Sequence, residues 1–162
     1  MPFGIGSKSA QTPSESSQQS KSNTKGAFLH LIAGLDDATP YRVYHKWRKV
    51  GDVAQKGMPH HSQIFICNAA DVEVLNFGLF GNANGMVEYC NDGNDPNNPY
   101  HTSTSYKPNP KVATGREITA AINRAQLKCG PNYKLLHNNC QKFARIFMTA
   151  LGSSHSRELF HP

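Results

Sequence analysis

The strongest constraint on the fold is a helical pattern near the end of this 162-residue chain. Apolar side chains recur there at the spacing of one helix face, and they are Phe143, Ile146, Phe147, Ala150 and Leu151. Gly152 follows directly, at a position where helices commonly end in a left-handed residue. The pattern predicts a helix from about residue 138 to Leu151, whose apolar face packs against the rest of the domain.

The middle of the chain carries the alternating, β-branched and aromatic runs that are typical of strands. Strands are predicted over residues 41–47, 62–67, 72–77 and 86–90. Because the short polar segment 68–71 separates the second run from the third, these two runs are expected to form an antiparallel hairpin.

A second helix is predicted before the C-terminal one. Thr114 and Glu117 have the spacing of a capping box, in which each side chain satisfies the main-chain N–H group of the other residue. An apolar stripe follows, and Gly130 ends it. Residues 28–35 also carry a helical stripe, with a strand as the alternative. The predicted fold class is therefore α+β, with a small antiparallel sheet packed against the C-terminal helix and one or two further helices.

Composition divides the chain into two parts. Residues 1–25 are rich in Ser, Gln, Lys and Thr and poor in large apolar side chains, so a disordered tail is expected there. Residues 26–162 are expected to form one domain. Within this domain, residues 91–111 are dense in Asn, Asp, Pro, Ser and Thr, and they predict a long loop that covers the functional site as a lid.

Charge and cysteine content exclude several classes of protein. The formal net charge is +6, but the basic residues are scattered, so a nucleic-acid-binding protein is not expected. Weak contact with an anionic membrane surface stays open. No stretch approaches the roughly 18 apolar residues of a membrane helix, and no secretory signal pattern is present at the start. The 4 cysteines form no close pair. We therefore expect a cytoplasmic protein with reduced thiols and without a metal or other cofactor.

Cys140 is the candidate nucleophile. It lies in the first turn of the predicted C-terminal helix, where unpaired N–H groups and the helix dipole favour the thiolate. The N–H groups of this turn, next to Asn139 and Gln141, are candidates to stabilise an oxyanion. The alternative is a small buried cysteine that only packs in the core.

His61 is the candidate base. It follows Pro59 and opens the strand predicted over 62–67, and a histidine at the mouth of a strand can point toward a helix N-terminus that packs on the same sheet. An imidazole there would take the thiol proton and later protonate the leaving group. The alternative is an exposed loop histidine without a catalytic role.

Two segments resemble the conserved boxes of circularly permuted papain-fold cysteine hydrolases. Tyr133-Lys-Leu-Leu-His-Asn-Asn-Cys140-Gln-Lys-Phe143 is similar to the cysteine box of that superfamily, and Pro59-His60-His61-Ser-Gln-Ile-Phe-Ile to its histidine box. The histidine precedes the cysteine, as the permuted order requires. The segment from Val72 to Gly78 looks like the second hairpin strand of the PPPDE peptidases. The lecithin:retinol acyltransferase-like and NlpC/P60 branches share both boxes, and the resemblance covers about residues 41–160.

The resemblance implies a thiol hydrolase that cleaves a peptide or isopeptide bond, including bonds to ubiquitin-like modifiers, through an acyl-enzyme. It implies a pair of Cys140 and His61, with Glu73 or Asn76 as candidate residues to orient the imidazole. A protein or peptide would be the substrate. Two alternatives stay open: an acyltransferase or phospholipase of the acyltransferase-like branch, and an inactive binding module on the same fold.

Overall fold

The computed structural model describes residues 32–50, 60–134, 137 and 139–155. The tail predicted over residues 1–25, and the start of the domain at residue 26, lie outside the described residues. The same holds for part of the stripe predicted over 28–35, of which Ile32 and Leu35 are described and pack on the core.

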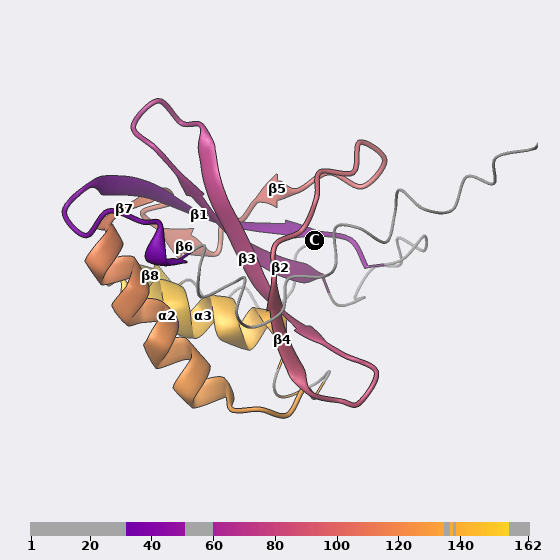
Figure 1. Ribbon diagram of the computed structural model, residues 1–162. Helices are drawn as coiled ribbons and strands as arrows, with labels where there is room; N and C mark the ends of the chain where they lie inside the picture. Colours follow the sequence, from indigo (N-terminus) through magenta and orange to yellow (C-terminus); the bar gives the residue numbers. More distant parts are fainter. Residues whose placement is uncertain (1–31, 51–59, 135–136, 138, 156–162) are drawn as a thin grey trace, which may run out of the picture.

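The described residues form an antiparallel sheet with two helices on one of its faces (Figure 1). The elements in chain order are β1 (Pro40–Arg48), β2 (His61–Cys67), β3 (Glu73–Gly81), β4 (Val87–Cys90), β5 (His101–Thr102), β6 (Tyr106–Lys107), β7 (Lys111–Thr114), α2 (Gly115–Cys129), α3 (Cys140–Ala150) and β8 (Ser154–His155). The main sheet has the strand order β4-β3-β2-β1-β5, with β7 also paired to β1. The α+β class and the four predicted strands, the last of them the short β4, are confirmed.

The hairpin between β2 and β3 forms as predicted. Oδ1 of Asn68 accepts hydrogen bonds from the N–H groups of Ala70 and Val72, each over 3.0 Å, and so closes the turn. Asp71 has a φ of 64°, a left-handed conformation that aspartate tolerates better than most residues. The strands are then paired antiparallel, which places alternate β2 side chains on the helix side of the sheet.

Both helices begin at a capping side chain, and the capping box predicted for α2 is confirmed. In α2, Oγ1 of Thr114 accepts from the N–H of Glu117 over 3.3 Å, and Oε2 of Glu117 accepts from the N–H of Thr114 over 2.8 Å. In α3, Oδ1 of Asn139 accepts from the N–H of Lys142 over 3.0 Å. Gly152 follows α3 with a φ of 79°. Neither of these helices is long and apolar enough to cross a membrane.

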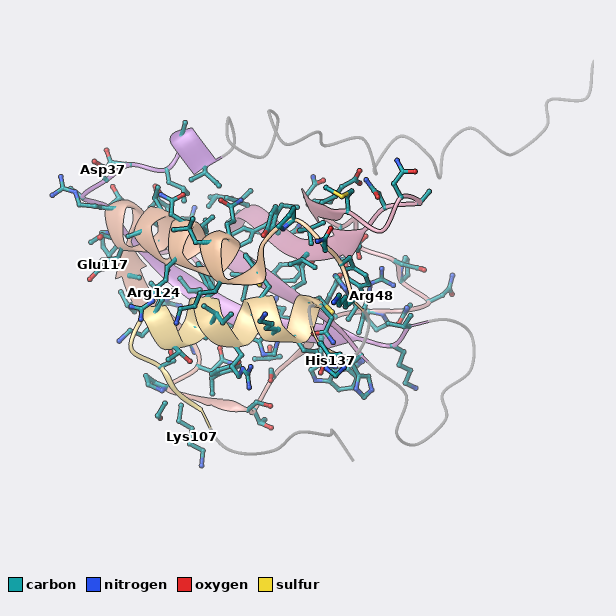
Figure 2. All side chains as sticks on the ribbon, turned by 90° about the horizontal axis from the view of Figure 1, so that it is seen from below. Asp37, Arg48, Lys107, Glu117, Arg124 and His137 are labelled. Carbon is teal, nitrogen blue, oxygen red and sulfur yellow. The ribbon has the colours of Figure 1, made fainter. Side chains whose placement is uncertain are left out.

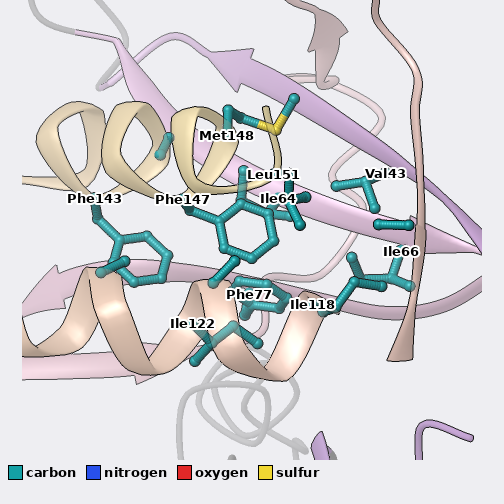
Figure 3. Close-up of a cluster of buried hydrophobic side chains, with 14 of the residues drawn as sticks. Val43, Ile64, Ile66, Phe77, Ile118, Ile122, Phe143, Phe147, Met148 and Leu151 are labelled. Atoms are coloured by element: carbon teal, nitrogen blue, oxygen red, sulfur yellow. The ribbon is translucent and has the colours of Figure 1, made fainter. Parts of the chain in front are cut away.

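The core lies between the sheet and the two helices (Figure 3). Phe77 of β3 meets Phe143 and Phe147 of α3 edge to face, with ring centroids 6.1 and 5.4 Å apart. Ile118 and Ile122 of α2 complete this layer and are fully buried. The predicted stripe of the C-terminal helix therefore packs on the sheet as expected.

The segment 91–111 is only partly a loop, which corrects the prediction. His101–Thr102 pairs with β1, and Tyr106–Lys107 pairs with Ser154–His155. Strands of two residues have no detectable periodicity, and their partners here lie far away in the sequence. Tertiary pairing therefore sets them, and composition alone suggested a continuous loop.

We predict that Phe147→Ala lowers the free energy of unfolding by about 3–5 kcal/mol, because it opens a cavity against Phe77. Leu127→Ala is the control, since Leu127 is 85% exposed on α2 and should change this free energy by less than about 0.5 kcal/mol. Urea unfolding followed by circular dichroism measures both values. Similar losses in the two variants would contradict the packing of α3 described above.

Candidate functional site

Cys140, the predicted nucleophile, is the first residue of α3, and its sulfur lies against the main chain at the start of β2. The N–H of Ser62 donates a hydrogen bond to Sγ over 3.4 Å. The thiol in turn approaches the carbonyl oxygen of His60 at 3.7 Å. These two main-chain groups flank His61 in the chain, so the sulfur lies beside the backbone of the predicted base. Only 6% of Cys140 is exposed.

The sulfur lies beside the first residues of β2, which precede the part of β2 that pairs with β3. The register of this pair begins at Ile64 opposite Phe77 and runs away from the site. β2 nevertheless continues to its first residue, because its pairing with β1 extends to Arg48 opposite His61. The thiol therefore satisfies main-chain polar groups that lie beyond the described pairing of β2 with β3.

The ring of His61 is also buried, with 7% of the residue exposed. Its Nε2 lies 2.9 Å from Oε1 of Gln63, which is two residues further along β2 and on the same face of the strand. The ring packs on Phe80 at a centroid distance of 4.3 Å and meets Tyr100 at 6.4 Å. Gln63 and the two aromatic rings therefore restrict the orientation of the imidazole.

The hydrogen bonds of Gln63 determine which nitrogen of His61 carries the proton. Nε2 of Gln63 donates to Oδ1 of Asn76 over 2.9 Å and to the carbonyl oxygen of Cys90 over 3.1 Å. Because both partners are acceptors, the amide turns its oxygen toward His61. Nε2 of the neutral imidazole must then be the protonated nitrogen, and Nδ1 keeps the lone pair.

The two candidate orienting residues reach His61 only through Gln63: Asn76 is hydrogen-bonded to Gln63, and Glu73 is hydrogen-bonded to Asn76. Oδ1 of Asn76 also accepts from the N–H of Asp92 over 2.8 Å, and its Nδ2 donates to Oε1 of Glu73 over 2.6 Å. Asn76 and Glu73 thus hold Gln63 in place, and Gln63 contacts His61. Gln63 was not among the predicted site residues, although its position two residues after His61 on a predicted strand places both side chains on one face.

A second polar group lies beside the imidazole. Oδ2 of Asp92 accepts from Nε of Arg48 over 2.8 Å and from the hydroxyl of Tyr100 over 2.6 Å, and Nη2 of Arg48 lies 2.7 Å from the same oxygen. Asp92 and Tyr100 belong to the 91–100 part of the predicted lid, which lies against His61 on the side away from the helices. Figure 2 shows Arg48 near the end of α3 that carries Cys140.

Burial keeps the imidazole neutral. It lowers the pKa of His61 from 6.5 to about 4, and the positive charge of Arg48 acts in the same direction. The hydrogen bond to Gln63 and the carboxylate of Asp92 oppose this shift but do not cancel it. At neutral pH, His61 is therefore in the uncharged form that can accept a proton.

Burial also favours the neutral thiol. It raises the pKa of Cys140, and the N–H groups of Ser62, Gln141 and Cys140 oppose this shift, as does the charge of Arg48. The sequence predicted a thiolate from the helix N-terminus. The structure differs because the sulfur is shielded from water more strongly than the helix end stabilises its charge.

The two residues predicted near an oxyanion have different positions. Nε2 of Gln141 donates over 3.2 Å to the carbonyl oxygen of His60, the group that the thiol also approaches, so this side chain lies beside the sulfur. The side chain of Asn139 caps α3 instead. All 4 cysteines are free, and the described residues contain no group of three or more His, Cys, Asp or Glu that is placed to hold a metal ion.

Acid should destabilise the protein partly through His61. The unfolded state binds a proton near pH 6.5 and the folded state only near pH 4, so the free energy of unfolding falls as the pH drops through this window. At the lower end of this pH window, the loss in the free energy of unfolding that comes from His61 reaches about 3 kcal/mol. His61→Gln should lose this component, as measured by urea unfolding of both proteins between pH 7.5 and 4.5. Parallel curves for the two proteins would contradict a buried neutral imidazole.

Gly78→Ala should disturb His61 without touching it. A Cβ at position 78 would lie 1.9 Å from Oε1 of Gln63 and 3.1 Å from the carbonyl oxygen of Ser62, so the amide must leave the imidazole. We expect a loss of about 1–3 kcal/mol in the free energy of unfolding, and a changed tautomer signal of His61 in ¹⁵N NMR. Gly93→Ala is the control, because nothing lies within 4 Å of its added Cβ. An unchanged His61 signal in Gly78→Ala would count against the amide network.

The chain matches no protein-family model, no curated protein and no solved structure. The likeness to permuted papain-fold hydrolases therefore rests on the two sequence boxes. The structure itself establishes an α+β fold with an antiparallel sheet and two helices on one face.

Proposed function

We propose that the chain is a thiol hydrolase of the permuted papain-like type, with Cys140 as nucleophile and His61 as base. One observation carries the proposal: the sulfur of Cys140 lies on the main-chain groups of residues 60 and 62, which flank His61 in the chain. The hydrogen bond of Gln63 at Nε2 supports it, because Nδ1 is left with the lone pair. Of the two ring nitrogens, Nδ1 is also separated by fewer bonds from the main chain, which is the part of the strand that the sulfur contacts.

In the acylation step, Nδ1 of His61 takes the thiol proton as Sγ of Cys140 attacks the substrate carbonyl carbon. A neutral thiol and a neutral imidazole suit this step, because the charges of the imidazolium and the oxyanion then develop only as the bond between sulfur and carbon forms. The N–H groups of the first turn of α3 lie near the sulfur, where they can stabilise the oxyanion. The imidazolium returns its proton to the departing amine, and a thioester remains on Cys140.

In the second step, water attacks the thioester while His61 takes a proton from it, and the acid product leaves as the thiol is restored. The likeness to the PPPDE peptidases favours a peptide or isopeptide substrate, including bonds to ubiquitin-like modifiers. The 91–100 segment acts as the lid in this proposal, because Tyr100 lies against the ring of His61 and has to move before substrate reaches the imidazole.

An inactive binding module is the second candidate, and the burial of the site is the observation that favours it. Cys140 and His61 are both more than nine-tenths buried. A protein that no longer turns over substrate has no need to admit one. The two candidates differ in whether the thiol becomes reactive in solution.

Turnover of peptide, isopeptide and acyl-ester substrates by the full chain tests this proposal. Cys140→Ala should abolish hydrolysis of at least one of these substrates, and His61→Gln should lower its kcat/KM by about 10²–10⁴-fold through loss of the base. Cys129→Ala is the matched control, because Cys129 is a buried thiol at the end of α2, and it should keep the activity. Mass spectrometry after reaction with a chloroacetamide probe should find the label on Cys140.

Two outcomes would decide against catalysis. Equal turnover by the wild type and Cys140→Ala assigns the activity to another group or a contaminant. Absence of turnover together with an unlabelled Cys140 favours the inactive binding module.

A further inference from the structure

The outward face of the helix layer carries four cations. They are Arg124 and Lys128 on α2 and Lys142 and Arg145 on α3. Figure 2 looks onto this face and shows the two helices side by side, with Arg124 between them. We call these four residues the basic face.

The cations of the basic face have no acidic partners among the residues that the structure describes. The ion pairs found there involve Arg42, Arg48 and Arg116 instead. Nζ of Lys142 donates to the carbonyl oxygen of Lys128 over 3.3 Å, which ties the two helices together without neutralising the charge. Glu117 lies on the same helix layer, but its carboxylate caps α2. In the described part of the chain, no carboxylate therefore forms an ion pair with the cations of the basic face.

A single large apolar side chain projects from the same surface. Leu127 is 85% exposed, the highest value among the exposed large apolar residues. It lies three residues after Arg124 and next to Lys128, so it stands on the outward side of α2 with cations beside it. Folding gains nothing from this leucine, which makes it available to another surface.

We propose that the basic face adsorbs to the surface of an anionic phospholipid membrane, with Leu127 entering the interface. Lysine and arginine beside an exposed leucine on a helix suit a layer that is negative outside and apolar beneath. No aromatic side chain is exposed on α2 or α3, whereas single-stranded nucleic acids are held by aromatic stacking and protein interfaces are enriched in aromatic residues. The charge and the lone leucine fit a lipid surface better than either alternative.

The position of the basic face places the candidate nucleophile near the membrane. Lys142 lies in the first turn of α3, two residues after Cys140, and Lys128 lies near the end of α2. Adsorption would thus bring the N-terminal end of α3 to the lipid. The proposal itself does not depend on catalysis, because binding is measured without turnover.

Co-sedimentation of the full chain with vesicles tests the proposal. Vesicles of phosphatidylcholine with about 30% phosphatidylserine should bind the chain, and pure phosphatidylcholine vesicles should not. Lys128→Glu should lower the partition coefficient at least about fivefold, and Arg124→Glu together with Lys128→Glu should lower it further. Leu127→Ser should weaken binding about threefold or more, since it removes the apolar contact.

Lys49→Glu is the matched control, because it changes the net charge equally at an exposed position just after β1. It should leave binding within about twofold of the wild type. Equal losses for Lys49→Glu and Lys128→Glu would overturn the proposal, since net charge alone would then explain binding. Absence of binding to the anionic vesicles would also overturn it. So would tighter, Lys128-dependent binding to polyglutamate or to a single-stranded oligonucleotide, which would assign the face to an acidic macromolecule.

Discussion

The contact between the sulfur of Cys140 and the main chain of β2 is the interaction on which the candidate site depends. It joins residues that are 78 positions apart, from Ser62 to Cys140. The stripe that buries α3 also aims the sulfur, because Cys140, Phe143 and Phe147 share one helix face. Packing of the two phenylalanines on Phe77 therefore fixes both the depth of the helix and the place of the thiol.

The burial that makes this contact also sets the charge state of the site. Phe80 and Tyr100 pack on the ring of His61, and burial lowers the pKa of this imidazole. Burial of Cys140 at the start of α3 raises the pKa of its thiol. A thiolate–imidazolium pair is thus disfavoured in the closed state. Movement of Tyr100 away from His61 would restore hydration of this ring, and its pKa would then shift back toward the ordinary range.

Local sequence patterns predicted the main helices and strands. Features that depend on pairing between distant segments were not predictable from the sequence. The capping box at Thr114, the stripe of α3 and the hairpin after β2 are local signals, so the sequence predicted them. Strand β5 and the place of Arg48 opposite His61 depend on register between distant segments. The buried neutral thiol was not predictable either, because a helix N-terminus is visible in the sequence and the depth of burial is not.

The choice of an amide at position 63 follows from the same dry environment. A carboxylate there would attract the proton of His61 and raise the pKa of the imidazole, but it would itself be a buried charge with a high cost of dehydration. Gln63 accepts the Nε2–H bond without a charge, and its own N–H groups are satisfied by Asn76 and the carbonyl oxygen of Cys90. Space for this amide exists only because position 78 has no side chain. The side chains that contact the imidazole directly are therefore neutral, and Glu73 and the charged pair of Arg48 and Asp92 lie beyond them.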